Sequence, residues 1–180
     1  MCWPSCRSGW PYSRWRASPD SPLRSTRLNQ PHDLTIRAYV EDDFDDLVAR
    51  WHETNLVSYR YNAVQQGHTL TDARRFFRDK LLPACEIWVA ERSCRLLGLL
   101  CLEAPWIRQF AIFPEHQRMG IGTALLQKAR EHSPAELHLF TFQRNEVARA
   151  FYEKHGFVAV AFDVSPAPEL EPDVKYRWSA

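Results

Sequence analysis

Two glycines stand just before an apolar helical run in the stretch HQRMGIGTALLQKAR, which covers residues 116–130. At a helix start several backbone N–H groups lack internal partners and the helix dipole is positive, so a bound phosphate can satisfy both. Gly120 and Gly122 would let the backbone approach such a ligand without a Cβ in the way. Thr123 can add a hydroxyl donor. The stretch therefore predicts an anion-binding site where a strand leads into a helix.

Two common phosphate-binding motifs do not fit this stretch. A Walker P-loop needs G-x-x-x-x-G-K-[ST], and both the spacing and the lysine are missing. The dinucleotide fingerprint G-x-G-x-x-G fails because Leu125 stands where the third glycine belongs. We therefore expect neither a P-loop nucleotide site nor a dinucleotide site of this type.

The stretch resembles motif A of the GCN5-related N-acetyltransferase (GNAT) family, (Gln/Arg)-x-x-Gly-x-(Gly/Ala), which is present at residues 117–122. Further along, LHLFTFQRNEVARAFYEKHGFVAV is similar to the fifth strand, fourth helix and sixth strand of that family. The final PDVKYRW resembles the closing strand of many bacterial members, so the resemblance covers residues 34–178. The family signature Asn-x-x-Ala-x-x-Phe-Tyr-x-x-x-Gly-Phe is present at Asn145, Ala148, Phe151, Tyr152, Gly156 and Phe157.

The resemblance implies acetyl-CoA as cosubstrate and no metal. In the family the pyrophosphate lies on the amides of motif A, and the pantetheine arm pairs with the edge of the fourth strand like an additional strand. One N–H group of that strand would also polarise the thioester carbonyl. The cofactor-binding residues implied in this way are Phe110, Ala111 and Ile112 on the strand, Gln117, Arg118, Met119, Gly120, Ile121, Gly122 and Thr123 in motif A, and Asn145 and Phe151 in the later signature.

Acyl transfer to an amine needs an uncharged nucleophile and a proton for the departing thiolate. The resemblance implies that Tyr152 faces the cofactor and donates this proton. Packing beside Phe151, with no chemical role, is the alternative. The base is less defined, and a chain of waters could also carry the proton. Its candidates are Glu103 at the end of the third strand, followed by His52, Glu53 and His68.

Four further positions carry an alternative or depart from the family pattern. Asn145 can cap the helix that follows it or reach the pantetheine. His138 is expected to lie in the sheet as a polar side chain with a partner. Met119 stands where the family is often basic, so phosphate binding there would rely on amides. Arg108 stands where relatives with a similar strand often have an acid, which bears on the choice of acceptor.

Two functions from different classes remain open. The first is an acetyl-CoA-dependent N-acetyltransferase that transfers an acetyl group to a primary amine of a small molecule or peptide by direct attack in a ternary complex. The second is a catalytically inactive acyl-CoA-binding module or sensor with the same fold. In the family the acceptor is lined by the first two helices and the final hairpin, here residues 51–61, residues 67–70 and the loop SPAPELEP at 165–172.

Hydrophobic periodicity and turn signals predict the elements that must position these residues. Thr71 is the expected N-cap of the second helix, which Pro83 should stop. With the resemblance, the pattern predicts an α/β (α+β) GNAT fold: a mixed central sheet of about six to seven strands with about four helices, the fourth and fifth strands splayed. Strands are expected at residues 34–40, 86–91, 95–103 and 106–113, and helices at 41–51, 71–81 and about 120–132.

Composition sets limits on function. With 23 Lys+Arg against 22 Asp+Glu among 180 residues, the net charge is +1, so no global field favours nucleic acid or an anionic membrane. We expect neither a transmembrane helix nor a signal peptide, because the apolar runs are too short for them. The five cysteines form no C-x-x-C pair and are read as reduced thiols. We expect a cytoplasmic protein acting on a small-molecule or peptide amine; a homodimer, common in the family, stays open.

Residues 1–33 differ in character from the rest of the chain, being rich in Ser, Pro and Arg without hydrophobic periodicity. Trp3, Trp10 and Trp15 alternate with arginines there, which leaves a membrane or RNA contact as an alternative, and the composition is faintly similar to an organellar transit peptide. We expect a disordered extension without a role in the chemistry. A single GNAT acetyltransferase domain would then occupy residues 34–180.

Overall fold

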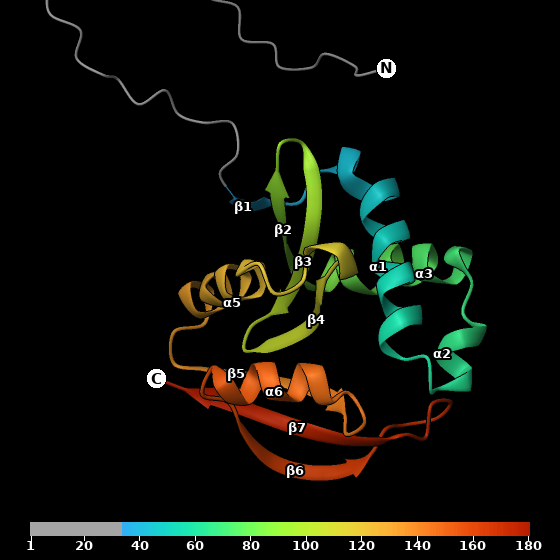
Figure 1. Cartoon of the computed structure of the whole chain (residues 1–180), viewed down its shortest axis with the longest axis vertical. Coiled ribbons are helices and arrows are strands. Elements are labelled where there is room, and N and C mark those ends of the chain that lie inside the picture. Colours follow the sequence, from blue (N-terminus) through green and yellow to red (C-terminus); the bar gives the residue numbers. More distant parts are fainter. Residues whose placement is uncertain (1–33) are drawn as a thin grey trace, which may run out of the picture. The chain divides into compact units, whose positions relative to one another are not determined.

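The computed structural model describes residues 34–180, and the predictions made for residues 1–33 lie outside the described residues. None of the helices in this described part has the length and apolar character needed to cross a bilayer. The strands are β1 (Thr35–Ala38), β2 (Glu86–Arg92), β3 (Arg95–Glu103), β4 (Trp106–Ile112), β5 (Glu136–Phe142), β6 (Val158–Val164) and β7 (Pro172–Ser179) (Figure 1). The helices are α1 (Phe44–Ser58), α2 (Ala63–Gly67), α3 (Leu70–Phe76), α4 (Leu82–Ala84), α5 (Ile121–His132) and α6 (Glu146–Lys154), with short helical turns η1 (Glu41–Asp43), η2 (Phe77–Leu81) and η3 (Pro114–His116).

The strands form one seven-stranded sheet within residues 34–180, in the order β1-β2-β3-β4-β5-β7-β6. All neighbours are antiparallel except β4 and β5, which run parallel and pair only at Trp106 and His138 in this described part. The two strands start side by side and then separate, which leaves the edge of β4 beyond Trp106 without a partner strand. The predicted mixed sheet with splayed fourth and fifth strands is therefore confirmed.

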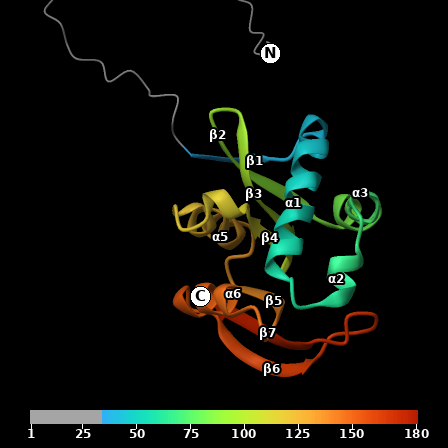
Figure 2. The same ribbon diagram turned by 45° about the vertical axis from the view of Figure 1, so that its right-hand side comes forward.

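Helices cover both faces of the sheet, and each face has its own hydrophobic cluster. On one face α5 and α6 pack through Leu125, Leu126 and Tyr152. On the other face α1, α3 and η2 pack through Leu47, Val48 and other apolar side chains. Figures 1 and 2 show these two groups of helices on opposite sides of the central strands. The periodicity expected for the first helix is thus confirmed, because its apolar stripe faces the sheet.

The start of the second helix differs from the prediction. Thr69, not Thr71, is the N-cap of α3: its Oγ1 accepts a hydrogen bond from the Asp72 backbone N at 3.2 Å, while the Thr69 N donates to Asp72 Oδ2 at 3.1 Å. Thr71 was wrong because the residue three positions after it is Arg74, which cannot accept the reciprocal bond of a capping box. The helical region ends at Ala84, one residue beyond Pro83, which lies in the first turn of α4.

Candidate active site

The segment that enters α5 holds unpaired backbone donors. Gly120 is the N-cap residue, with φ at 81° in the left-handed region, and no side chain caps the helix. Within residues 34–180, no backbone or side-chain acceptor is hydrogen-bonded to the N–H groups from Arg118 to Thr123. A Cβ built on Gly120 would have no atom within 4 Å, so the space beside it is open. Such a row of free N–H groups at a positive helix end suits an anion, and the residues present fit a pyrophosphate.

Gly122 serves a different purpose from Gly120. A Cβ placed there would lie 3.1 Å from the Phe151 ring and 3.7 Å from Ile112 Cγ1. Glycine at this position therefore lets the first turn of α5 pack directly against α6 and the end of β4. Both glycines were predicted to make room for a ligand, whereas at Gly122 the close neighbour is the Phe151 side chain.

Several side chains of motif A are already engaged within the protein. Gln117 Nε2 donates to the Ile112 carbonyl at 3.1 Å, which ties the loop to the end of β4. Thr123 Oγ1 lies 3.1 Å from His155 Nε2, and His155 Nδ1 lies 2.8 Å from the Phe151 carbonyl. The contact of His155 with motif A was not predicted from the sequence. Its position just before Gly156 of the family signature is the only sequence feature that could have indicated it. The Ile121 side chain is buried in the core, so only its amide can face a ligand.

The side chains of Arg118 and Met119 point to the exposed surface, with Met119 51% exposed. Neither forms a hydrogen bond with another residue in the described part of the chain. The described residues thus leave both side chains free, and the backbone N–H groups of the same two residues belong to the unpaired row described above.

The free edge of β4 lies beside the start of α5. Phe110, Ala111 and Ile112 pair with β3 on one side, whereas on the side that faces β5 no strand of residues 34–180 pairs with them. The Phe110 ring contacts Phe151 at 5.7 Å and Tyr152 at 6.1 Å between centroids. The three strand residues, motif A and the two aromatic residues of α6 are thus brought together, as the resemblance implied.

Tyr152 is the buried aromatic residue at the centre of this arrangement. It is 6% exposed, and its ring also contacts Phe157 and Tyr176. Among residues 34–180 no group forms a hydrogen bond with its hydroxyl. Burial raises the pKa of Tyr152 well above its ordinary value, and the nearby Tyr59 raises it further. The hydroxyl therefore keeps its proton at neutral pH, which suits a proton donor and excludes a tyrosinate base.

Asn145 caps α6, as one of its two expected roles required. Its Oδ1 accepts a hydrogen bond from the Ala148 N at 3.2 Å. Its side chain also lies close enough to the hydroxyl of Tyr59, the C-cap residue of α1, to affect the pKa of that group. Burial raises the pKa of Tyr59, and the interaction with the Asn145 side chain offsets part of this rise. The end of α1 and the start of α6 are thus close together, and no local sequence pattern could have indicated this.

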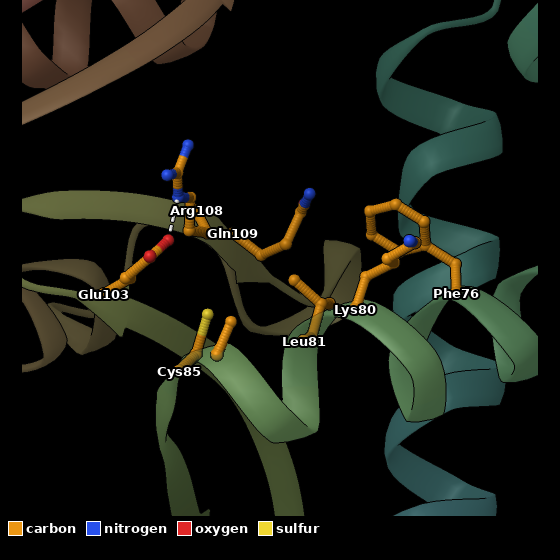
Figure 3. A pocket seen from close by; sticks show the side chains of 8 residues that line it. Phe76, Lys80, Leu81, Cys85, Glu103, Arg108 and Gln109 are labelled. Atoms are coloured by element: carbon orange, nitrogen blue, oxygen red, sulfur yellow. Dashed lines mark hydrogen bonds and ion pairs between the residues drawn. The ribbon is translucent and has the colours of Figure 1, made fainter.

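The base candidates are separated by the fold. Glu103 Oε2 accepts from Arg108 Nε at 2.7 Å, and Figure 3 shows this pair at the wall of a pocket of about 250 Å³. Arg108 is the residue left without a β3 partner by a bulge in the register of β4. His52 and His68 instead line a larger cleft, while Glu53 is exposed on α1 outside both pockets.

The larger cleft, of about 1020 Å³, brings together the three segments expected to line the acceptor site. The cleft also reaches Gln109 of β4 and Phe140 of β5, where these strands separate. Gln109 and Lys80 are shared with the smaller pocket, so Glu103 lies beside this cleft. From the predicted acceptor segments it is lined by Trp51, His52, Asn55, Tyr59, His68, Ser165, Pro166 and Glu169.

His138 lies in β5, as predicted, but it is only partly satisfied. Its Nε2 is 3.3 Å from Glu136 Oε2, whereas its buried Nδ1 has no hydrogen-bond partner within the described residues. In the same part of the chain, no three His, Cys, Asp or Glu side chains gather in a metal-binding arrangement. The described cysteines, Cys85, Cys94 and Cys101, are free thiols.

Comparison with known proteins identifies the family to which the chain belongs. Peptidyl-lysine N-acetyltransferase YiaC of Escherichia coli is 35% identical over 81 residues, which are 44% of this chain and 55% of that protein. The chain thus spans little more than half of that relative's length. Apo YjaB of Escherichia coli superposes with a TM-score of 0.67 at 22% identity, over 81% of this chain and 97% of that one.

A spermidine N-acetyltransferase of Vibrio cholerae, solved with CoA and spermine, superposes with a TM-score of 0.62 at 21% identity, over 81% of this chain and 95% of that one. At these identities the two structures show a shared fold. The sequence pattern of the Acetyltransferase (GNAT) family matches residues 48–157, more than half of the chain, including motif A and the α6 signature. The chain therefore belongs to the acetyltransferase (GNAT) family.

Proposed function

We propose that this protein is an acetyl-CoA-dependent N-acetyltransferase that transfers the acetyl group to a primary amine of a small molecule or peptide by direct attack in a ternary complex. The observation that carries the proposal is the row of unpaired N–H groups from Arg118 to Thr123 beside the free edge of β4. The names of the relatives, which act on peptidyl-lysine and on spermidine, support an amine acceptor.

In this proposal the chain binds acetyl-CoA through its backbone. The amides from Arg118 to Thr123 hold the pyrophosphate, with Gly120 leaving the approach open. The free edge at Phe110, Ala111 and Ile112 pairs with the pantetheine amides as a further strand would. One N–H group of that edge polarises the thioester carbonyl as charge develops on its oxygen. The Phe151 ring and Asn145 form the α6 side of this proposed cofactor site.

The proposed reaction needs two proton transfers, one to the departing thiolate and one from the acceptor amine. The amine nitrogen forms a bond to the acetyl carbon, the carbon–sulfur bond breaks, and the thiolate takes the proton of Tyr152. Tyr152 suits this step because its hydroxyl has no partner within the described residues and its raised pKa keeps it protonated. The acceptor's own proton leaves through water or through a base, for which Glu103, His52 and His68 border the cleft.

The experiment that tests the proposal is a thiol-release assay over a panel of primary amines, with acetyl-CoA binding followed separately by thermal shift. A bound ligand that the unfolded chain does not bind raises the melting temperature by mass action. Release of CoA that depends on an added amine, with the acetylated amine seen by mass spectrometry, supports an enzyme. A melting-temperature rise with acetyl-CoA but no turnover across the panel would instead support the inactive acyl-CoA-binding module.

A further inference from the structure

Two carboxylates face each other on the sheet surface that borders the larger cleft. Asp163 of β6 and Asp173 of β7 are register partners, and both line the cleft. Directly opposed residues of an antiparallel pair lie on the same face of the sheet, with Cβ atoms about 5 Å apart. Like charges in this arrangement repel each other, so the pair needs compensation from elsewhere.

Neither carboxylate forms an ion pair with another described residue. Asp173 is 8% exposed, and its buried Oδ1 has no hydrogen-bond partner within residues 34–180. Asp163 is exposed and accepts one bond, from the Val164 N at 2.8 Å. Burial raises the pKa of Asp173, and the charge of Asp163 raises it further. A buried carboxylate oxygen without a donor is costly, which marks a place where a ligand can supply one.

Two basic side chains of neighbouring segments, Lys175 and Arg144, are engaged with other groups. Lys175 lies two residues further along β7, and its Nζ is 4.9 Å from the centre of the Trp106 ring. Arg144 lies over the Tyr61 ring at 4.5 Å and 3.8 Å from Glu171 Oε1. Neither of these two groups therefore neutralises the carboxylates of Asp163 and Asp173, which both line the cleft.

The position of the pair relative to β5 indicates which part of an acceptor it would meet. Asp173 is the register partner of Phe142 on β5, and the Phe142 ring lies 5.2 Å from that of Tyr59. Because neighbouring strands are about 4.8 Å apart, Asp173 and Asp163 lie roughly one and two strand spacings beyond β5. The opening between β4 and β5 is on the other side of β5. The pair is therefore displaced from the reacting amine, along the same cleft.

We propose that Asp163 and Asp173 form an anionic subsite that binds a second cationic group of the acceptor. The preferred acceptors are then dications, which carry another ammonium or guanidinium group in addition to the amine that is acetylated. The inference rests on the proposed function, because it takes the reacting amine to lie at the opening between β4 and β5. A cation in the subsite gives the Asp173 carboxylate a donor and relieves the repulsion between the two carboxylates.

The test compares 1,4-diaminobutane with 1-aminobutane, two acceptors that differ in the second ammonium group. The wild type should prefer the diamine in kcat/KM by roughly tenfold or more, the size expected from a charge-assisted hydrogen bond. Asp173→Asn should remove most of this preference, mainly through KM, and Asp163→Asn should reduce it. Asp42→Asn is the matched control, because it removes one exposed carboxylate of η1 away from the cleft and should leave the preference unchanged.

A second readout separates this inference from the proposed function. Without acetyl-CoA, 1,4-diaminobutane should raise the melting temperature of the wild type more than that of Asp173→Asn. If no amine is acetylated but this difference is found, the subsite stands and the proposed function fails. If both amines are acetylated equally well by wild type and variant, the subsite is rejected and the function stands. Should Asp173→Asn not fold, the exposed Asp163→Asn decides, and an unchanged preference there overturns the inference.

Discussion

Replacing Tyr152 by phenylalanine should remove the proton donor while keeping its ring in place. The ring is held by Phe110, Phe151, Phe157 and Tyr176, and all of these contacts remain in Tyr152→Phe. Loss of a positioned general acid lowers the rate by about 10²–10⁴-fold, and water can replace part of it, so we expect kcat to fall by roughly one to three orders of magnitude. KM for acetyl-CoA should change little, because the hydroxyl acts in the transition state.

The structure also predicts the effect on stability. No described residue hydrogen-bonds with the Tyr152 hydroxyl, so its deletion should change the free energy of unfolding by less than about 0.5 kcal/mol. Tyr176, whose ring centroid is 6.1 Å away, is the matched control. Its hydroxyl donates to Glu153 and accepts from Arg149 Nε at 3.2 Å. Tyr176→Phe should therefore destabilise the protein by about 1 kcal/mol while largely preserving kcat.

The assay is steady-state thiol release with an amine that the wild type prefers, combined with thermal unfolding of both variants. The pH profile adds a check. Since burial raises the pKa of Tyr152, its protonated form persists to higher pH than that of a free tyrosine, and kcat should show no loss from its ionisation between about pH 7 and 9. A wild-type kcat in Tyr152→Phe would refute the donor role and leave the residue as packing.

Three further predictions concern the cofactor site and the cleft. Gly120→Val should lose the rise in melting temperature that acetyl-CoA causes. A β-branched residue is strained at φ 81°, and its side chain fills the open space beside the helix start. An unchanged affinity for acetyl-CoA would contradict the assignment of this segment to the pyrophosphate. Asn145→Ala should lower the free energy of unfolding by about 1 kcal/mol in denaturant titrations, because it removes the cap of α6. Asn145→Asp keeps the cap and should lower this free energy less. An equal decrease in the two variants would show that the cap is not the cause. Asp173→Asn should raise the melting temperature at pH 7 by roughly 2–4 °C, because it removes a buried carboxylate opposite Asp163. The folded-state pKa of Asp173 is raised, so its ionisation lowers stability as the pH rises through that pKa, and the gain should vanish at about pH 3; a gain that persists there would contradict this origin.

Local patterns were enough to predict where the two helices of the candidate cofactor site begin. Gly120 at the N-cap of α5 and Asn145 at the N-cap of α6 act on residues within four positions, so their sequence spacing carries the geometry. The capping box of α3 was equally local, and the correct signal was Thr69 with Asp72 rather than Thr71. The splay of β4 and β5 was expected from the family resemblance, because periodicity describes single strands and not the edges that they leave free.

The acceptor side depended on the tertiary structure. The sequence by itself determined the order of the elements, the helix starts and the apolar faces, since these follow from side-chain periods along one segment. Only the fold decided that Glu103 pairs with Arg108, that Asn145 lies near Tyr59, and that Asp163 opposes Asp173. These contacts join segments whose relative position is set by strand register and by the packing of helices on the sheet. A shift of one residue in register would turn Asp173 to the other face, and no local pattern in this chain specifies that register.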